Sequence, residues 1–244
     1  MNQRFDMKTL FAIIIIVLLI QGFTTMDRES LLNTLYSLPG LVLAITVHEY
    51  FHARTSDKYG DPTPERQGRL TLNPLAHLDP VGTICLLFAG FGWGKPVEID
   101  PTYYRNPAKE SMKVALAGPL SNFVLALIMT VIFGIGLFLT YAGIIPANNT
   151  TQLILMLIWG AVVINISLGV FNLLPFPPLD GSKIYRYFLK GKAKEFLYTM
   201  ERYSTIIILI LFITEIPAML ITPVINALSS AMLMLVELML NVLM

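Results

Sequence analysis

Residues 31–52 read LLNTLYSLPGLVLAITVHEYFH, an apolar run that ends in the letters HEYFH. In a helix, His48 and His52 share one face about 5–6 Å apart, so both imidazoles can reach one metal ion. Glu49 follows the first histidine and can contact water on that metal without being a ligand itself. Ionisable side chains in a membrane span are energetically costly unless they are partnered or wetted. The run therefore predicts a metal site at the end of a membrane-spanning helix.

The composition places the whole chain in a membrane. Of its 244 residues, 55% are hydrophobic and 14% are charged, and the mean hydropathy is +0.67. Soluble domains carry roughly 25% charged residues, so this chain has too few to cover a water-soluble globule. A net charge of +1 argues against nucleic acid as a partner, because that requires a basic stripe. The single cysteine, Cys85, excludes an internal disulfide and a Cys-rich metal site.

The apolar runs predict an all-α membrane protein, a polytopic bundle of about six transmembrane helices in a single domain over residues 1–244. The predicted spans are residues 9–25, 31–52, 114–140, 152–174, 203–221 and 224–243. Pro217 and Pro223 divide the last long run into two helices joined by a turn. Residues 81–93 are short for a crossing and contain three glycines, so we expect a re-entrant or interfacial segment there.

The basic residues orient the predicted helices. Sixteen of the 17 Lys and Arg residues lie on one side of this arrangement, and Arg28 lies alone on the other. Cytoplasmic loops carry an excess of such residues, so we expect a multi-pass protein of the cell membrane with both termini and the metal site on the cytoplasmic side. Alternating side chains at residues 69–72 and 96–100 predict a small β element at the membrane surface. Within the second stretch, Val97 and Ile99 alternate with charged residues and predict a strand edge that another extended segment could pair with.

A catalytic zinc site uses three protein ligands and keeps one position for water, so a third ligand must join the two histidines. His77 and Cys85 are candidates, although His77 lies in a proline-broken loop where we expect a solvated side chain. Asp180 is the better candidate, because residues 172–181, NLLPFPPLDG, contain three prolines and cannot form a regular helix. Unwound backbone is tolerated at membrane depth where it lines a cavity. The alternative is that Asp180 belongs to an ordinary helix-terminating turn.

The two motifs together resemble the site-2 protease family of intramembrane metalloproteases, which combines a membrane-embedded HExxH with a later N-x-x-P-x-x-x-L-D-G segment. The second motif is matched by Asn172, Pro175, Leu179, Asp180 and Gly181. Residues 118–122, GPLSN, resemble a further element of the family.

The resemblance implies a function and a set of site residues. His48, His52 and Asp180 would bind one zinc ion, and Glu49 would be the catalytic acid/base. Asn172 would assist substrate binding or oxyanion stabilisation. The implied reaction is hydrolysis of a peptide bond of a transmembrane protein substrate, in or near the lipid bilayer.

Two other functions stay open from the sequence. One is a metal-binding membrane transporter, which needs polar ligands on several spans; the first and the last two predicted spans offer little beyond Gln21, Glu215 and Glu237. The other is a catalytically inactive relative that binds membrane peptides. Asn122, in the third predicted span, is expected either to form a polar contact between helices or to face the substrate.

Overall fold

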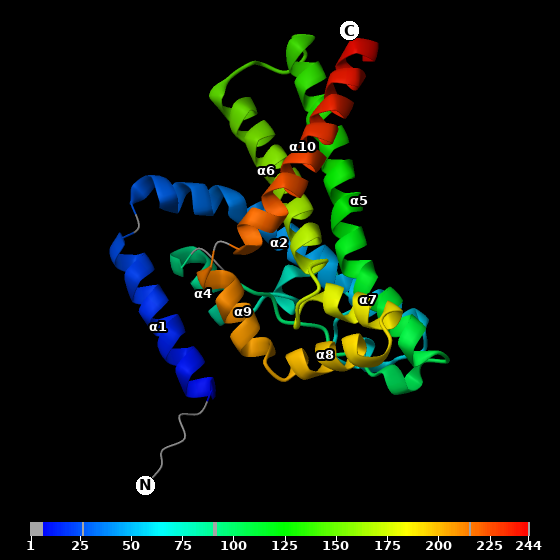
Figure 1. Ribbon diagram of the computed structural model, residues 1–244. Helices are drawn as coiled ribbons and strands as arrows, with labels where there is room; N and C mark the ends of the chain where they lie inside the picture. Colours follow the sequence, from blue (N-terminus) through cyan, green and yellow to red (C-terminus); the bar gives the residue numbers. More distant parts are fainter. Residues whose placement is uncertain (1–6, 26, 90–91, 215, 244) are drawn as a thin grey trace.

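The structure is a computed structural model that describes residues 7–25, 27–89, 92–214 and 216–243. These residues form helices joined by turns and extended loops (Figure 1). In chain order the helices are α1 (Met7–Thr25), α2 (Arg28–Lys58), α3 (Thr63–Arg66), η1 (Pro74–Ala76), α4 (Pro80–Ala89), η2 (Pro101–Tyr103), α5 (Pro107–Tyr141), α6 (Asn149–Asn172), α7 (Asp180–Phe188), α8 (Gly191–Glu201), α9 (Ser204–Ile213) and α10 (Ile216–Leu243).

Among the described helices, α2, α5, α6 and α10 are long and apolar enough to cross a membrane. Helices α5 and α6 form a hairpin, α10 packs against both, and α2 crosses them (Figure 1). Helix α1 stands apart from this bundle and packs against α4. The chain is therefore an all-α integral membrane protein, and the prediction of six spans is not confirmed.

The last long apolar run divides at a different place from the predicted one. Helix α9 has ten residues, about 15 Å of helix, which is too short for a hydrocarbon core of about 30 Å. The break between helices lies between Ile213 and Ile216. Pro223 lies inside α10, so the prediction that it separates two spans is wrong. A membrane helix tolerates such a proline because neighbouring groups satisfy the backbone that it frees.

Two features predicted at the membrane surface are the short segment at residues 81–93 and the small β element; the structure agrees with the first and does not confirm the second. Helix α4 has ten residues, in keeping with a segment too short to cross; residues 90 and 91 of the predicted segment 81–93 lie outside the described residues. The predicted β element is not confirmed, because residues 69–72 and 96–100 form no strand in the described structure, where Leu78 and Gly94 make an isolated bridge. Backbone groups of the second stretch bond to side chains instead.

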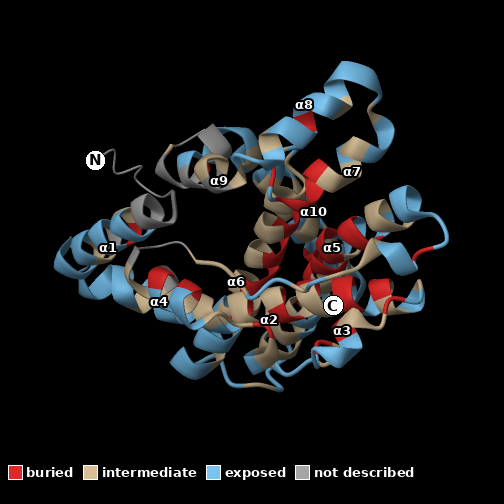
Figure 2. Cartoon of the chain, turned by 90° about the horizontal axis from the view of Figure 1, so that it is seen from below, coloured by how far each residue is buried: buried red, intermediate tan, exposed pale blue. Residues whose placement is uncertain are grey.

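Buried residues gather where α2, α5 and α6 meet (Figure 2). An apolar cluster of Ala126, Val162 and Ile166 joins α5 to α6. Close to it are polar side chains that are fully buried, among them Asn122 and Asn165. Polar groups without water must find partners within the protein, so this part of the bundle is where a functional site is expected.

Gly40 allows α2 to approach α6 closely. A Cβ atom at Gly40 would lie 2.9 Å from Ala161 Cα, whereas a Cβ at Gly160 on α6 would meet nothing within 4 Å. We predict that Gly40→Ala lowers the thermal unfolding midpoint of the detergent-purified protein, because overpacking of this kind costs about 1–3 kcal/mol. The matched change Gly160→Ala should leave the midpoint unchanged or raise it. Equal midpoints for the two variants would contradict this packing.

Candidate metal centre

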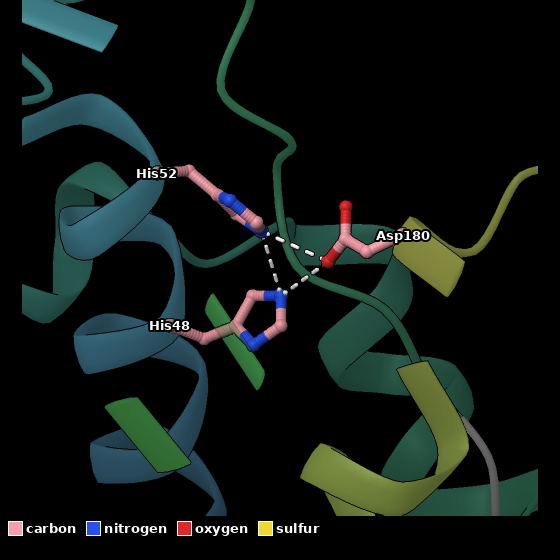
Figure 3. A group of neighbouring side chains, drawn as sticks. All are labelled: His48, His52 and Asp180. Carbon is pink, nitrogen blue, oxygen red and sulfur yellow. Dashed lines mark hydrogen bonds and ion pairs between the residues drawn. The ribbon is translucent and has the colours of Figure 1, made fainter. Parts of the chain in front are cut away.

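Three buried side chains from two distant segments meet at one point. His48 and His52 come from α2 and Asp180 is the first residue of α7 (Figure 3). The two imidazole Nε2 atoms lie 3.1 and 3.0 Å from Asp180 Oδ2, and 3.0 Å from each other. All three residues are buried. The structure thus brings together the three residues that the sequence indicated as ligands.

The hydrogen-bond partner of each imidazole Nδ1 atom shows which ring nitrogen carries the hydrogen. His52 Nδ1 is 2.7 Å from Val114 O, a carbonyl that can only accept, so Nδ1 carries the hydrogen. His48 Nδ1 is 2.7 Å from Asn122 Oδ1. The Asn122 amide nitrogen donates to Ala44 O and Asn165 Oδ1, so its oxygen is the acceptor. In their neutral forms both rings therefore present an Nε2 lone pair to the shared point.

This donor set fits a divalent cation such as zinc. With both rings neutral, two nitrogen lone pairs and a carboxylate oxygen at about 3 Å repel one another unless a metal ion or a proton lies between them. Tetrahedral zinc with ligands at about 2.0–2.1 Å would separate its ligand atoms by about 3.3–3.4 Å. The observed separations of 3.0–3.1 Å are close to that value. In the described part of the chain these residues form a group that can hold a metal ion.

The loop between α6 and α7 places Asp180. Helix α6 ends at Asn172 and α7 begins at Asp180, so the proline-rich stretch between them is unwound, as the sequence predicts. A Cβ atom at Gly181 would lie 2.2 Å from Leu174 O, so glycine is required for the first turn of α7 to lie against the loop that follows α6. The carboxylate at the first residue of α7 also complements the positive end of the helix dipole.

Helix α5 supports the histidines by close approach and by hydrogen bonding. A Cβ atom at Gly118 would lie 2.4 Å from His52 Nε2 and 2.7 Å from His48 Cε1. One turn later, Asn122 joins α2 to Asn165 on α6. Partners of this kind fix the orientation of metal-binding imidazoles. Sequence reasoning missed Asn165, although it is an amide inside an apolar span and could have been selected on the same grounds as Asn122.

The remaining sequence candidates lie outside the cluster. His77 is fully buried, with Nε2 2.8 Å from Thr71 O, so the expectation of a solvated loop histidine is wrong. Cys85 is buried in α4. The amide nitrogen of Asn172 donates to Leu168 O within α6. Neither His77 nor Cys85 belongs to the group that converges with Asp180.

Glu49 is held beside the cluster by a backbone group. Its side chain is half-buried, and its Oε2 atom accepts a hydrogen bond of 2.9 Å from Val97 N. Glu49 therefore has one carboxylate oxygen anchored by the backbone and lies next in sequence to His48.

Comparisons with known proteins connect this geometry to one family. The family model described as peptidase family M50 matches residues 135–214, a range that includes Asp180. YwhC of Bacillus subtilis (strain 168), provisionally named a zinc metalloprotease, is 38% identical over 193 residues, which cover 79% of this chain and 86% of that protein. The chain belongs to peptidase family M50, the site-2 protease family.

Further proteins similar to this M50 chain carry the same provisional name. One from Methanocaldococcus jannaschii is 30% identical over 189 residues, covering 75% of this chain and 86% of its own length. Rip2 of Mycolicibacterium smegmatis is 30% identical over 186 residues, covering 72% of this chain and 66% of its own. No solved structure matches. As an M50 member with apolar helices, this chain is an intramembrane zinc metalloprotease.

We predict that Gly118→Ala weakens zinc binding about 10–100-fold, as changes next to ligands do, because the new methyl group collides with both histidine rings. Zinc per chain, measured by mass spectrometry after dialysis against a competing chelator, tests this. Gly134→Ala on the same helix is the control, since its methyl group meets the flexible end of Met239 at 3.0 Å. Wild-type zinc retention in Gly118→Ala would contradict the close approach.

Proposed function

We propose that this M50 protease hydrolyses a peptide bond of a transmembrane protein substrate, with His48, His52 and Asp180 as zinc ligands and Glu49 as the general base and acid. The observation that carries the proposal is the convergence of the two Nε2 atoms and Asp180 Oδ2 within 3.1 Å. The family membership and the anchored carboxylate of Glu49 support the same assignment.

The chemistry follows from these groups. When bound by these residues, zinc would lower the pKa of a coordinated water toward neutrality and would act as a Lewis acid on the scissile carbonyl. Glu49 accepts a proton from the attacking water and returns it to the nitrogen of the departing amine. The carbonyl of Val114 and the amide of Asn122 keep the two imidazoles in one orientation during this cycle.

The substrate must lose helical structure before it can react, because helical hydrogen bonds hide its carbonyl groups. We assign residues 95–101 as the segment that holds the unwound stretch by edge pairing. In support, Val97 and Ile99 are half-buried and alternate with exposed Glu98, and the Val97 backbone lies at Glu49. Asn172 is assigned to substrate binding or oxyanion stabilisation from the family motif.

The proposed setting is the cell membrane, with the metal centre on the cytoplasmic side. The predicted cytoplasmic C-terminus is not part of this proposal, because α9 is too short to cross and α10 ends near the turn between α5 and α6 (Figure 1). The support is the distribution of basic residues, which are concentrated between α2 and α5 and along α7 and α8. Excess Lys and Arg mark cytoplasmic loops. A transporter function is less consistent with the described residues, in which His48, His52 and Asp180 make one three-ligand group rather than sites along a path.

We predict that Glu49→Gln keeps zinc bound and lowers cleavage of a membrane-embedded peptide by at least about 100-fold, since general-base catalysis contributes about 10²–10⁴-fold. Asp180→Asn should lower zinc retention as well, because a neutral amide replaces an anionic ligand. Both are measured on full-length protein in liposomes, by peptide cleavage and zinc content. Glu65→Gln, at an exposed position, is the control. Wild-type cleavage by Glu49→Gln would contradict the proposal.

We predict that a photoreactive side chain at position 98, between Val97 and Ile99, crosslinks to a bound transmembrane peptide. The same group at exposed position 65 should not. The measurement is the mass of the crosslinked product formed with the inactive Glu49→Gln variant, in which substrate is retained. Equal crosslinking at the two positions would remove residues 95–101 from the substrate path.

A further inference from the structure

Residues 95–100 form a segment without helix or strand that is hydrogen-bonded to Glu49 of α2; we call it the strap. Near its start, Val97 N donates to Glu49 Oε2 at 2.9 Å. At its end, Asp100 N donates to Asp61 Oδ2 at 2.8 Å, and the same oxygen accepts from Ser56 Oγ of α2 at 2.7 Å. The strap is thus joined to α2 at two places.

The distance between the two contacts is similar along helix α2 and along the strap. Glu49 and Ser56 are seven residues apart on α2, about 10.5 Å along a helix axis at 1.5 Å per residue. Val97 and Asp100 are three residues apart, and extended chain covers about 10 Å over that distance. The strap can therefore follow α2 without slack, and the hydrogen bond to Glu49 depends on how firmly its ends are held.

Arg69 holds the beginning of the strap. Its side chain is 2% exposed, and its Nη2 atom donates to Lys95 O at 2.8 Å and to Pro96 O at 2.6 Å. Its Nη1 atom donates to Ala76 O. Next to these bonds, Lys95 N donates to His77 O at 2.8 Å. One guanidinium therefore ties the two residues before Val97 to the loop that follows α3.

The retention of a charged side chain here needs a reason. Burial lowers the pKa of Arg69, and the nearby carboxylates of Glu49 and Glu98 oppose that effect. A buried cation is costly unless it is well bonded. A planar guanidinium donates to several carbonyl groups in fixed directions, which an ammonium or an apolar side chain cannot do. The hydrogen bonds to the backbone carbonyls of Lys95 and Pro96 are therefore the reason we give for an arginine at this buried position.

Asp61 holds the other end of the strap as an anion. Burial acts to raise the pKa of its carboxyl group, but hydrogen bonds from Thr63, Asp100 and Ser56 outweigh that effect and keep the pKa below its ordinary value. Asp61 is fully buried. Two buried charges of opposite sign, on either side of Val97, therefore fix the strap.

We propose that Arg69 is a positioning residue for catalysis, because it holds the strap so that Val97 N–H keeps the Glu49 carboxylate in its working orientation. This rests on the general-base function proposed for Glu49. It predicts that loss of the guanidinium slows the chemical step while zinc and substrate still bind. A displacement of a catalytic group by about 1 Å can lower a rate by about 100-fold.

The test uses full-length, zinc-loaded protein in liposomes with a transmembrane peptide, and compares Arg69→Gln, Arg69→Lys, Val97→Pro and the double variant Arg69→Gln/Val97→Pro. Val97→Pro removes the N–H donor itself. We expect each single variant to lose about 10–100-fold in kcat, with zinc content unchanged. Because residues 95–101 are also assigned to the substrate, KM can change, but by a smaller factor than kcat. The double variant should be no slower than the slower single variant, because both changes remove one contact. Arg66→Gln, at an exposed position, should match wild type.

Several outcomes would overturn the proposal. The first is a wild-type kcat in Arg69→Gln or Arg69→Lys. The second is a raised KM with unchanged kcat, which would assign the strap to substrate binding alone. The third is a loss of kcat in the double variant that equals the product of the two single losses. Should Arg69→Gln fail to fold, Arg69→Lys, which keeps the charge, decides alone. Cleavage by Glu49→Gln is a separate failure, since it removes the proposed general base whatever Arg69 does.

Discussion

Two imidazole lone pairs and a carboxylate oxygen lie within 3.1 Å of one another in a buried place. With neutral imidazoles such an arrangement is repulsive unless a metal ion or a proton lies between the atoms, and a metal ion can bind all three atoms at once. The surrounding helices and loops bring these three atoms together. Helix α2 supplies both histidines through its four-residue spacing, and the unwound loop before α7 brings the carboxylate across from α6.

The neighbouring helices then make this arrangement rigid. Gly118 lets the α5 backbone lie against the histidine rings, and the bonds from Asn122 to Ala44, His48 and Asn165 connect α2, α5 and α6. In a membrane these polar atoms have no water as an alternative partner. The same bonds therefore stabilise the bundle and orient the ligands. Outside the bundle, the strap connects the general-base candidate to a separate set of buried charges.

The sequence correctly predicted that His48, His52 and Asp180 converge, because the features that indicate this are local or belong to a motif. Two histidines four residues apart lie on the same face of a helix, and three prolines before Asp180 predict an unwound loop. Gly118 lies in the GPLSN stretch, but its contact with His52 depends on how α5 packs, which no local pattern contains. His77 was misjudged for a related reason: a proline-broken loop predicts exposure, whereas tertiary contacts bury this one.

Composition and periodicity predicted neither the helix boundaries near the C-terminus nor the backbone partners of residues 96–100. Residues 206–242 predicted two spans divided by prolines, yet α9 ends at Ile213, α10 begins at Ile216, and Pro223 is accommodated inside α10. Alternation at residues 96–100 predicted a strand, which is not confirmed. The backbone groups of this stretch bond to the side chains of Arg69, Glu49 and Asp61 instead of to a second strand. Side-chain partners so distant in the sequence cannot be inferred from periodicity.

The most direct test of the central claim is X-ray absorption at the zinc edge on the purified, zinc-loaded full chain. The three-ligand site predicts nitrogen and oxygen neighbours at about 2.0–2.2 Å, including two imidazoles, and no sulfur. Replacement of Asp180 by Asn should change this spectrum or abolish the signal. A sulfur neighbour at about 2.3 Å, or a spectrum that is identical in the two proteins, would contradict the claim.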